Sequence, residues 1–251
     1  MNQDNLVVLV TGAASGMGLA CATYFAEQGA TVMGWDKNTQ QVTTSKRMHY
    51  LNCDVSQSDD VEKAYSQTCH VMGIPRVVIN CAGIAPAKRM AGRDGPMPLE
   101  QFQQVINVNL VGTFNVMRVA AYGMTQLSLE ENERERGVII NTASIAAYEG
   151  QIGQLAYSAS KGGVVAMTLP AARELASMSI RVNTIAPGLV ATPLLLNMPE
   201  EVQESLANTV TFPKRLGAPE EFARLCGHIV TNEYINGEII RLDGALRMQA
   251  K

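Results

Sequence analysis

Short apolar runs alternate with helical segments along the chain, and this alternation constrains the fold more than any other feature of the sequence. The first run, Leu6 to Val10, is continuous and apolar, which is typical of a strand buried on both faces of a parallel sheet. Further strands are predicted at Thr31 to Trp35, Met48 to Cys53, Arg76 to Ile79, Val138 to Thr142, Ile180 to Ile185 and Glu238 to Leu242. Residues 1–251 are therefore predicted to form a single α/β domain, a Rossmann-type doubly wound parallel sheet flanked by helices on both faces.

The segments between these strands carry helical patterns. One helix follows the first strand and ends at Gly29, and others are predicted at Ser56 to Met72, Leu99 to Leu127, Ala156 to Ser177, Pro193 to Val210 and Pro219 to Ile229. Ser56 and Asp59 have the spacing of a capping box. Residues 84–98 are predicted to be a loop because they are rich in glycine, proline and basic side chains, and residues 130–136 a solvated connection.

Polar residues, glycine and proline fall at or just beyond the ends of the predicted strands. They are Gly12, Asp36, Asp54, Asn80, Ser144 and Pro187. In open parallel sheets, ligands bind outside the carboxyl ends of the strands. We therefore expect these residues to surround one binding crevice.

The turn after the first strand has the composition of a phosphate-binding loop. Gly12, Gly16 and Gly18 are spaced G-x-x-x-G-x-G, and glycines let the backbone approach a pyrophosphate whose charge lies at the helix N-terminus. Asp36 ends the second strand, where a carboxylate accepts hydrogen bonds from the adenosine ribose and repels a 2′-phosphate. The turn itself holds no basic residue, and Lys37 is the one nearby cation that could offset this repulsion. The pattern favours NAD(H) over NADP(H).

Tyr157 and Lys161 are four residues apart on a predicted helix, so they lie on one helical face. A phenol titrates near pH 10, and a lysine ammonium one turn away is expected to lower the pKa of Tyr157 by favouring the phenolate. Ser144 follows the fifth predicted strand and could bring a third polar group to the same point. These side chains are candidates for general acid/base catalysis.

Five motifs resemble, in order and in spacing, the signature set of the short-chain dehydrogenase/reductase family. They are Thr11-Gly12 to Gly18, Asn80 to Gly83, Ser144, Tyr157 to Lys161, and Pro187-Gly188. The resemblance covers essentially the whole chain and implies hydride transfer between an alcohol carbon and a nicotinamide. The implied roles are Tyr157 as general acid/base, Ser144 as hydrogen-bond donor to the substrate oxygen, Lys161 as ligand of the nicotinamide ribose, and Asn109 as the residue that holds a water in a proton relay.

The same resemblance assigns the remaining contacts, most of them within residues 6–83. The implied cofactor-binding residues are Gly12, Ser15, Gly16, Met17, Gly18, Asp36, Asp54, Val55, Asn80, Cys81, Ala82, Gly83, Tyr157, Lys161, Pro187, Gly188, Val190 and Thr192. Gln154 joins Ser144 and Tyr157 as an implied substrate contact. Cys81 stands where the family more often has a second asparagine, and Asp243-Gly244-Ala245 departs from the usual double glycine. Neither difference touches a reacting group.

A narrower resemblance is to the type II 3-hydroxyacyl-CoA dehydrogenases, a group also called 17β-hydroxysteroid dehydrogenase type 10. It is carried by Asn141 to Ser144, Glu149 to Gln151, Tyr157 to Gly163, Met167 to Pro170, Ala186 to Leu189, Thr192 to Leu195 and Arg241 to Gly244. It implies NAD as cofactor, a homotetramer, and interconversion of a short-chain or 2-methyl-branched 3-hydroxyacyl-CoA with its 3-oxoacyl-CoA, including the reduction of acetoacetyl-CoA.

Two segments are expected to set substrate choice. Residues 84–98 carry basic side chains that could meet the phosphates of coenzyme A or form an ordinary solvated loop, namely Lys88, Arg89 and Arg93. Residues 189–213 carry apolar side chains that could form a lid over an acyl chain or pack as an ordinary helix, namely Leu194, Leu195, Leu196 and Met198.

Other functions stay open at this point. A dehydrogenase of another secondary alcohol or of a steroid fits the same motifs, as does a 3-oxoacyl-carrier-protein reductase, although Asp36 and the net charge of −3 argue against NADPH and a basic carrier site. A non-catalytic module that senses NADH would often lack the tyrosine or the lysine. A serine hydrolase built on Ser144 would need a G-x-S-x-G motif, which the chain lacks.

Composition excludes several classes of protein. The net charge of −3 and the lack of a basic cluster disfavour nucleic acid as a partner. No apolar run has the length of a membrane span, and no signal peptide is visible, so we expect a cytoplasmic protein that does not enter a membrane. Five cysteines without C-x-x-C spacing and three histidines predict reduced thiols and no metal site.

Overall fold

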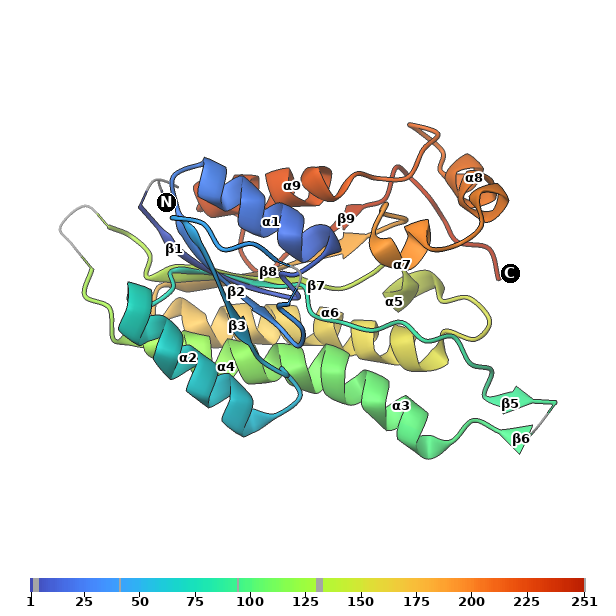
Figure 1. Ribbon diagram of the computed structural model, residues 1–251, viewed down its shortest axis with the longest axis horizontal. Helices are drawn as coiled ribbons and strands as arrows, with labels where there is room; N and C mark the ends of the chain where they lie inside the picture. The colour runs from blue at the N-terminus through green and yellow to red at the C-terminus, as the bar shows by residue number, and fades with distance from the viewer. Residues whose placement is uncertain (2–4, 41, 94, 130–132, 251) are drawn as a thin grey trace.

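Seven parallel strands form the central sheet in the order β3-β2-β1-β4-β7-β8-β9 (Figure 1). The computed structural model describes residues 1, 5–40, 42–93, 95–129 and 133–250. The strands are β1 (Val7–Thr11), β2 (Thr31–Asp36), β3 (Met48–Asn52), β4 (Val77–Asn80), β7 (Gly137–Thr142), β8 (Ile180–Pro187) and β9 (Ile239–Leu242). The strand order reverses between β1 and β4, which places a ligand-binding crevice outside the carboxyl ends of these two strands. The predicted Rossmann-type α/β fold is confirmed.

Apolar side chains on both faces of the sheet explain why the strand sequences are continuous apolar runs. In β1, Val8 and Val10 pack into the core on one face, and Leu9 packs into the core on the other. Helices α1 (Gly16–Glu27) and α9 (Pro219–Thr231) cover the first face. Helices α2 (Ser58–Met72), α4 (Gly112–Thr125) and α6 (Leu155–Ala176) lie on the second face, as Figure 1 shows. Helices on both faces bury every central strand.

The long helix predicted from Leu99 to Leu127 is present but contains a turn of a different kind. Helix α3 (Leu99–Ile106) continues through a π-helical segment, η1 (Asn107–Val111), into α4 without a break in the chain direction. Asn109 lies within this π-helical segment and is fully buried. Single π turns inside α-helices are frequent at functional sites.

Three local expectations are corrected by the structure. The loop at residues 84–98 contains a small antiparallel hairpin, β5 (Ala91–Gly92) and β6 (Gly95–Pro96). The single helix expected from Pro193 to Val210 is two helices, α7 (Pro193–Leu196) and α8 (Glu200–Thr209), because Pro199 disfavours helical backbone at the residue before it. A further helix, α5 (Ala146–Glu149), follows β7 and was not expected.

The predicted capping box at Ser56 and Asp59 is also wrong. Helix α2 starts at Ser58, and its N-terminus carries no side-chain cap. The Ser56 hydroxyl instead donates to Asp54 Oδ1 at 2.7 Å. The Ser56 hydroxyl therefore binds Asp54 and does not cap the helix. The S-x-x-D pattern does not include Asp54, so it gives no sign of this alternative partner.

Candidate active site

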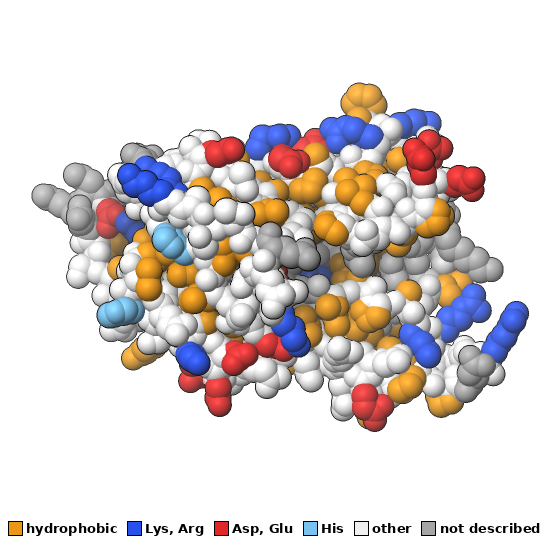
Figure 2. All heavy atoms as spheres, in the orientation of Figure 1, with side chains coloured by type: hydrophobic (Ala, Val, Ile, Leu, Met, Phe, Trp, Pro, Cys, Tyr) orange, Lys and Arg blue, Asp and Glu red, His pale blue; other side chains and the backbone are white. Residues whose placement is uncertain are grey.

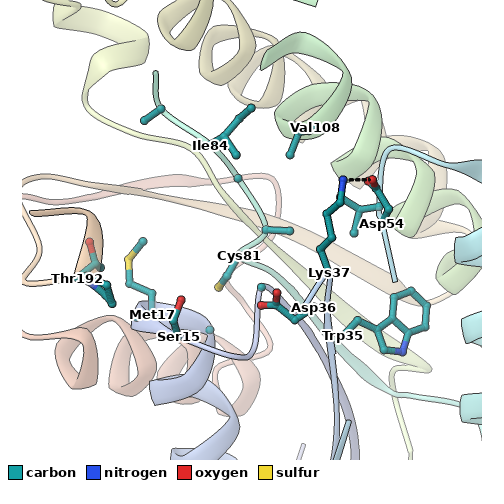
Figure 3. Close-up of a pocket in the computed structure, with 18 of the residues that line it drawn as sticks. Ser15, Met17, Trp35, Asp36, Lys37, Asp54, Cys81, Ile84, Val108 and Thr192 are labelled. Carbon is teal, nitrogen blue, oxygen red and sulfur yellow. Dashed lines mark hydrogen bonds and ion pairs between the residues drawn. The ribbon is translucent and has the colours of Figure 1, made fainter. Parts of the chain in front are cut away.

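A cleft of about 540 Å³ opens outside the carboxyl ends of β1, β2 and β4 (Figure 3). Most residues that sequence analysis assigned to cofactor binding line it, namely Gly12, Ser15, Gly16, Met17, Gly18, Asp36, Asp54, Val55, Cys81, Ala82, Gly83, Tyr157 and Thr192. The lining also includes residues that sequence analysis did not assign to cofactor binding, namely Trp35, Lys37, Cys53, Ile84, Ala85, Gln104, Val108 and Pro193. Several of these directly adjoin assigned residues, but Gln104 and Val108 reach the cleft from α3 and the π-helical segment, and no motif marks them.

The glycine turn is shaped to receive an anion. Gly12 has a φ of +65°, and a Cβ there would lie 2.8 Å from the backbone nitrogen of Ala82. A Cβ on Gly18 would lie 2.1 Å from the carbonyl oxygen of Gly12, so only glycine lets α1 start this close to the turn. The Ser15 side chain does not cap α1, and the first turn holds no acidic residue. The amide groups at this helix N-terminus therefore fit the pyrophosphate of a dinucleotide.

Asp36 is fixed at the rim of the cleft by two backbone amides. Its Oδ2 accepts a hydrogen bond from the Ala14 amide at 3.0 Å, and its Oδ1 accepts one from the Asn38 amide at 3.1 Å. These bonds hold the carboxylate beside the glycine turn, and the remaining lone pairs of both oxygens are available to hydroxyl groups. A ribose diol fits this arrangement, and a phosphate in the same place would be repelled.

Ser144 and Tyr157 come from different elements and share a hydrogen bond. Ser144 lies just after β7, and its Oγ accepts the Ala146 amide at 3.1 Å. Tyr157 lies in the first turn of α6 and lines the cleft. Burial raises the pKa of the Tyr157 phenol, and the hydrogen bond with Ser144 lowers it by a smaller amount.

Lys161 is buried one helical turn beyond Tyr157. Its Nζ donates to the carbonyl oxygen of Thr142 at 2.7 Å and lies 5.8 Å from the centre of the Tyr157 ring. Burial lowers the pKa of Lys161 to about 8. The sequence led us to expect a lowered pKa for Tyr157, whereas in this structure burial raises the pKa of the phenol.

Asn109 joins the π-helical segment to two neighbouring parts of the site. Its Oδ1 accepts the Ile84 amide at 2.8 Å, and its Nδ2 donates to the Ile84 carbonyl at 2.9 Å and to Ser160 Oγ at 3.0 Å. Ser160 in turn donates to the carbonyl oxygen of Tyr157 at 2.7 Å. The Asn109 side chain therefore connects the loop after β4 to α6, the helix that carries Tyr157. The water that the family resemblance assigns to Asn109 stays a prediction.

Some of the assigned residues do not line the cleft. Asn80 is buried and donates from Nδ2 to Asn141 Oδ1 at 2.9 Å. Gly188 follows β8 and packs against Asp243, where a Cβ would lie 2.8 Å from the Asp243 Cβ. Val190 lines a separate cavity of about 230 Å³. The cofactor contacts that the family resemblance assigns to these three residues stay predictions.

Also absent from the lining of this cleft are Asn109, Ser144, Gln154, Lys161 and Pro187. Lys161 is nevertheless close to it, because a Cβ on Gly83 would lie 3.7 Å from Nζ. Gln154 precedes α6, and its Oε1 accepts the Gln151 amide at 3.0 Å. Within the described ranges, no group of three or more His, Cys, Asp or Glu side chains could hold a metal ion. In the same part of the chain, no helix is long and apolar enough to cross a membrane.

Comparison with known proteins agrees with this geometry. The family model described as short chain dehydrogenase matches residues 6–203. The chain therefore belongs to the short-chain dehydrogenase family and is an oxidoreductase.

Among its relatives is 3-hydroxyacyl-CoA dehydrogenase type-2 of Bos taurus, which is 51% identical over 97% of this chain and 96% of its own length. The protein of the same name from Drosophila melanogaster is 46% identical over 97% and 98% of the two chains. A crystal structure of 3-hydroxyacyl-CoA dehydrogenase type-2 from Mycobacterium avium superposes with a TM-score of 0.93 and 38% identity, covering 100% of this chain and 98% of the other.

Proposed function

We propose that this oxidoreductase interconverts 3-hydroxyacyl-CoA and 3-oxoacyl-CoA with NAD(H) as cofactor. The observation that carries the proposal is that Tyr157, hydrogen-bonded to Ser144, lines the same cleft as the glycine turn and Asp36. The candidate acid/base group and the candidate dinucleotide site thus line the same cleft. Relatives that match almost the full length of the chain bear the name of this activity.

The cofactor-binding residues divide along the cleft. The N-terminus of α1 receives the pyrophosphate, and Asp36 the adenosine ribose. Asp54 and Val55 border the adenine end, and Cys81, Ala82 and Gly83 form the wall beside the ribose. Thr192 lies across the cleft from Gly16, where a Cβ on that glycine would lie 3.2 Å from Thr192 Cγ2. Thr192, with Val190, Pro187 and Gly188 behind it, borders the nicotinamide end.

The protein side of the reaction follows from the positions of the polar side chains. Bound NAD supplies the hydride acceptor. Ser144 donates a hydrogen bond to the substrate oxygen, and Tyr157 takes the hydroxyl proton during oxidation and returns it during reduction. Lys161 holds a positive charge one helical turn from Tyr157 and binds the nicotinamide ribose. Asn109 fixes the backbone around Tyr157 and supports a water in the proton relay.

The basic side chains in and just before the β5–β6 hairpin support coenzyme A as part of the substrate. Lys88, Arg89 and Arg93 have no ion-pair partner among the described acidic side chains. Figure 2 shows basic side chains gathered at the end of the molecule that carries β5 and β6. Lys88 and Arg89 border a hollow of about 810 Å³ that also reaches Ala146, two residues after Ser144, and Ser158, which follows Tyr157. Lysine and arginine side chains beside an open hollow suit the phosphates of a long thioester.

The segment between β8 and α9 supports an acyl-chain site. Leu196 and Met198 are half exposed, and α8 buries no side chain against the sheet. An apolar surface of this kind suits contact with an acyl chain when the segment closes over substrate.

Two further features belong to the proposal. Helices α4 and α6 expose large apolar side chains, among them Phe114, Tyr122 and Leu169, which suit burial between the subunits of a homotetramer.

The described cysteines are all free thiols, which suits a reducing compartment such as the cytoplasm.

A substrate panel tests the proposed function. Purified protein is assayed with 3-hydroxyacyl-CoA esters of increasing chain length, with 2-methyl-branched esters, with free secondary alcohols and with steroids, each with NAD and with NADP. The proposal expects the highest kcat/KM with a short or 2-methyl-branched CoA ester and NAD. A clear preference for free alcohols or steroids removes the CoA assignment, and a preference for NADP removes the cofactor assignment.

A further inference from the structure

Lys37 stands where a cation would weaken discrimination against NADP(H). It follows Asp36 at the end of β2, and both side chains line the cleft. Asp36 repels the 2′-phosphate that distinguishes NADP(H), whereas a lysine ammonium in the same region attracts it. The balance between the two neighbours therefore depends on where the ammonium of Lys37 is held.

The ammonium of Lys37 is held by Asp54. Nζ lies 2.7 Å from Asp54 Oδ2. Figure 3 shows the Lys37 side chain reaching Asp54, while the Asp36 carboxylate lies on the side of Ser15 and Met17. The other oxygen of Asp54 is occupied by Ser56, whose amide and hydroxyl lie 3.1 and 2.7 Å from Oδ1. Asp54 thus presents a fixed carboxylate oxygen to the lysine.

Charges around this pair keep the lysine protonated and paired. The pKa of Lys37 is raised, mainly by the hydrogen bond to Asp54 and its charge, and to a smaller extent by the charge of Asp60. Partial burial raises the pKa of Asp54, but hydrogen bonds from Lys37 and Ser56 outweigh that effect and leave the pKa below its usual value. The pair is therefore ionised over the whole physiological range. Most of the Lys37 side chain is exposed, so the pair is weak enough for one substitution to release the ammonium.

We propose that Asp54 is a cofactor-specificity residue that acts through Lys37, by holding an ammonium that would otherwise neutralise a bound 2′-phosphate. Asp36 excludes NADP(H) only as long as this ion pair occupies Lys37. The inference rests on the proposed use of NAD(H).

Binding of the two reduced cofactors tests the inference without relying on turnover. Trp35 is the only tryptophan and lines the cleft, so quenching of its fluorescence reports the Kd of NADH and of NADPH. The variants are Asp54→Asn, Lys37→Ala and the double variant. Asp59→Asn is the matched control, because Asp59 is a carboxylate five residues further along the chain, in the first turn of α2, and does not pair with Lys37.

Asp54→Asn is expected to improve the affinity for NADPH relative to NADH roughly fivefold. This ratio corresponds to the free energy of an exposed ion pair, which the variant no longer forms with Lys37. The double variant is expected to return to the ratio of Lys37→Ala, and Asp59→Asn to keep the wild-type ratio. An unchanged ratio in Asp54→Asn overturns the inference. So does an equal gain in the Lys37→Ala background or in Asp59→Asn, because either result reflects general charge removal.

A failure of the proposed NAD preference and a failure of the role proposed for Asp54 give different results. If the wild-type protein binds NADPH as tightly as NADH, the proposed NAD preference fails. The shift from wild type to Asp54→Asn is measured separately and still decides whether Asp54 restrains Lys37. Thermal melts of each variant establish that the comparison is made between folded proteins.

Discussion

The ammonium of Lys161 donates a hydrogen bond to the carbonyl oxygen of Thr142 across 2.7 Å, and both residues are buried. The bond ties α6, which carries Tyr157, to the end of β7, which leads into Ser144. The tyrosine and the serine are thus positioned relative to each other by a cation held between helix and strand. The cost of this arrangement is the burial of a charge, which lowers the pKa of Lys161 to about 8.

The buried ammonium predicts a specific dependence of stability on pH. Between about pH 8 and the unfolded value of 10.5, the unfolded chain holds the Lys161 proton and the folded protein does not, so stability rises with pH. The unfolding free energy of the wild-type protein, measured relative to that of Lys161→Met, should increase by roughly 2–3 kcal/mol as the pH rises across this window. Urea titrations of both proteins at several pH values measure it. A difference that does not change with pH would contradict the lowered pKa.

Replacing Tyr157 with phenylalanine should remove catalysis and leave cofactor binding in place. The phenol is the only group proposed to move the substrate proton, and such groups contribute about 10²–10⁴-fold to rate. We expect kcat for acetoacetyl-CoA reduction to fall by at least about 100-fold while the Kd for NADH stays within about twofold. Tyr234→Phe is the control, because Tyr234 is 99% exposed. Activity above a few per cent in Tyr157→Phe would refute the assignment.

Asn109→Ala should damage both stability and turnover. The substitution leaves the amide and the carbonyl of Ile84 without their partner and removes the donor to Ser160, and buried polar groups left unpaired cost about 1–3 kcal/mol each. We expect a loss of about 2–4 kcal/mol in unfolding free energy and a lower kcat. Asn107 lies in the same π-helical segment but is exposed, so Asn107→Ala is the matched control. Equal losses in the two variants would show that the segment, and not the amide of Asn109, is what matters.

Glu135→Gln should destabilise the fold without changing the active site. Glu135 Oε2 lies 2.5 Å from Arg181 Nε, and both side chains are only 7% exposed. Removing one charge of a buried pair costs about 3–5 kcal/mol, because the other is left without compensation. Arg181 lies near the amino end of β8, so the Kd for NADH should not change. Glu62→Gln, which disrupts an exposed pair with Arg118, should cost less than about 1 kcal/mol when measured by denaturation. A loss of that small size in Glu135→Gln would contradict the prediction.

The same buried pair marks a limit of sequence analysis. Residues 130–136 were expected to be a solvated connection. Residues 130–132 lie outside the described part of the chain, but Glu135 is buried, so the expectation is wrong at that position. A single run of charged residues gives no sign that one of them meets an arginine 46 positions away. Long-range ion pairs depend on how the strands are ordered, which local composition does not specify.

The alternation of apolar runs and helices was sufficient to predict the parallel sheet, because strands buried on both faces need continuous apolar sequence. The rule that ligands bind beyond the strand ends brought Gly12, Asp36, Asp54 and Ser144 to one edge of the sheet. Only the tertiary structure decided that Lys37 pairs with Asp54, that burial raises the pKa of Tyr157, and that Asn109 joins Ile84 to Ser160. Strand and turn positions follow from local periodicity, whereas partners and pKa values follow from contacts between residues far apart in the chain.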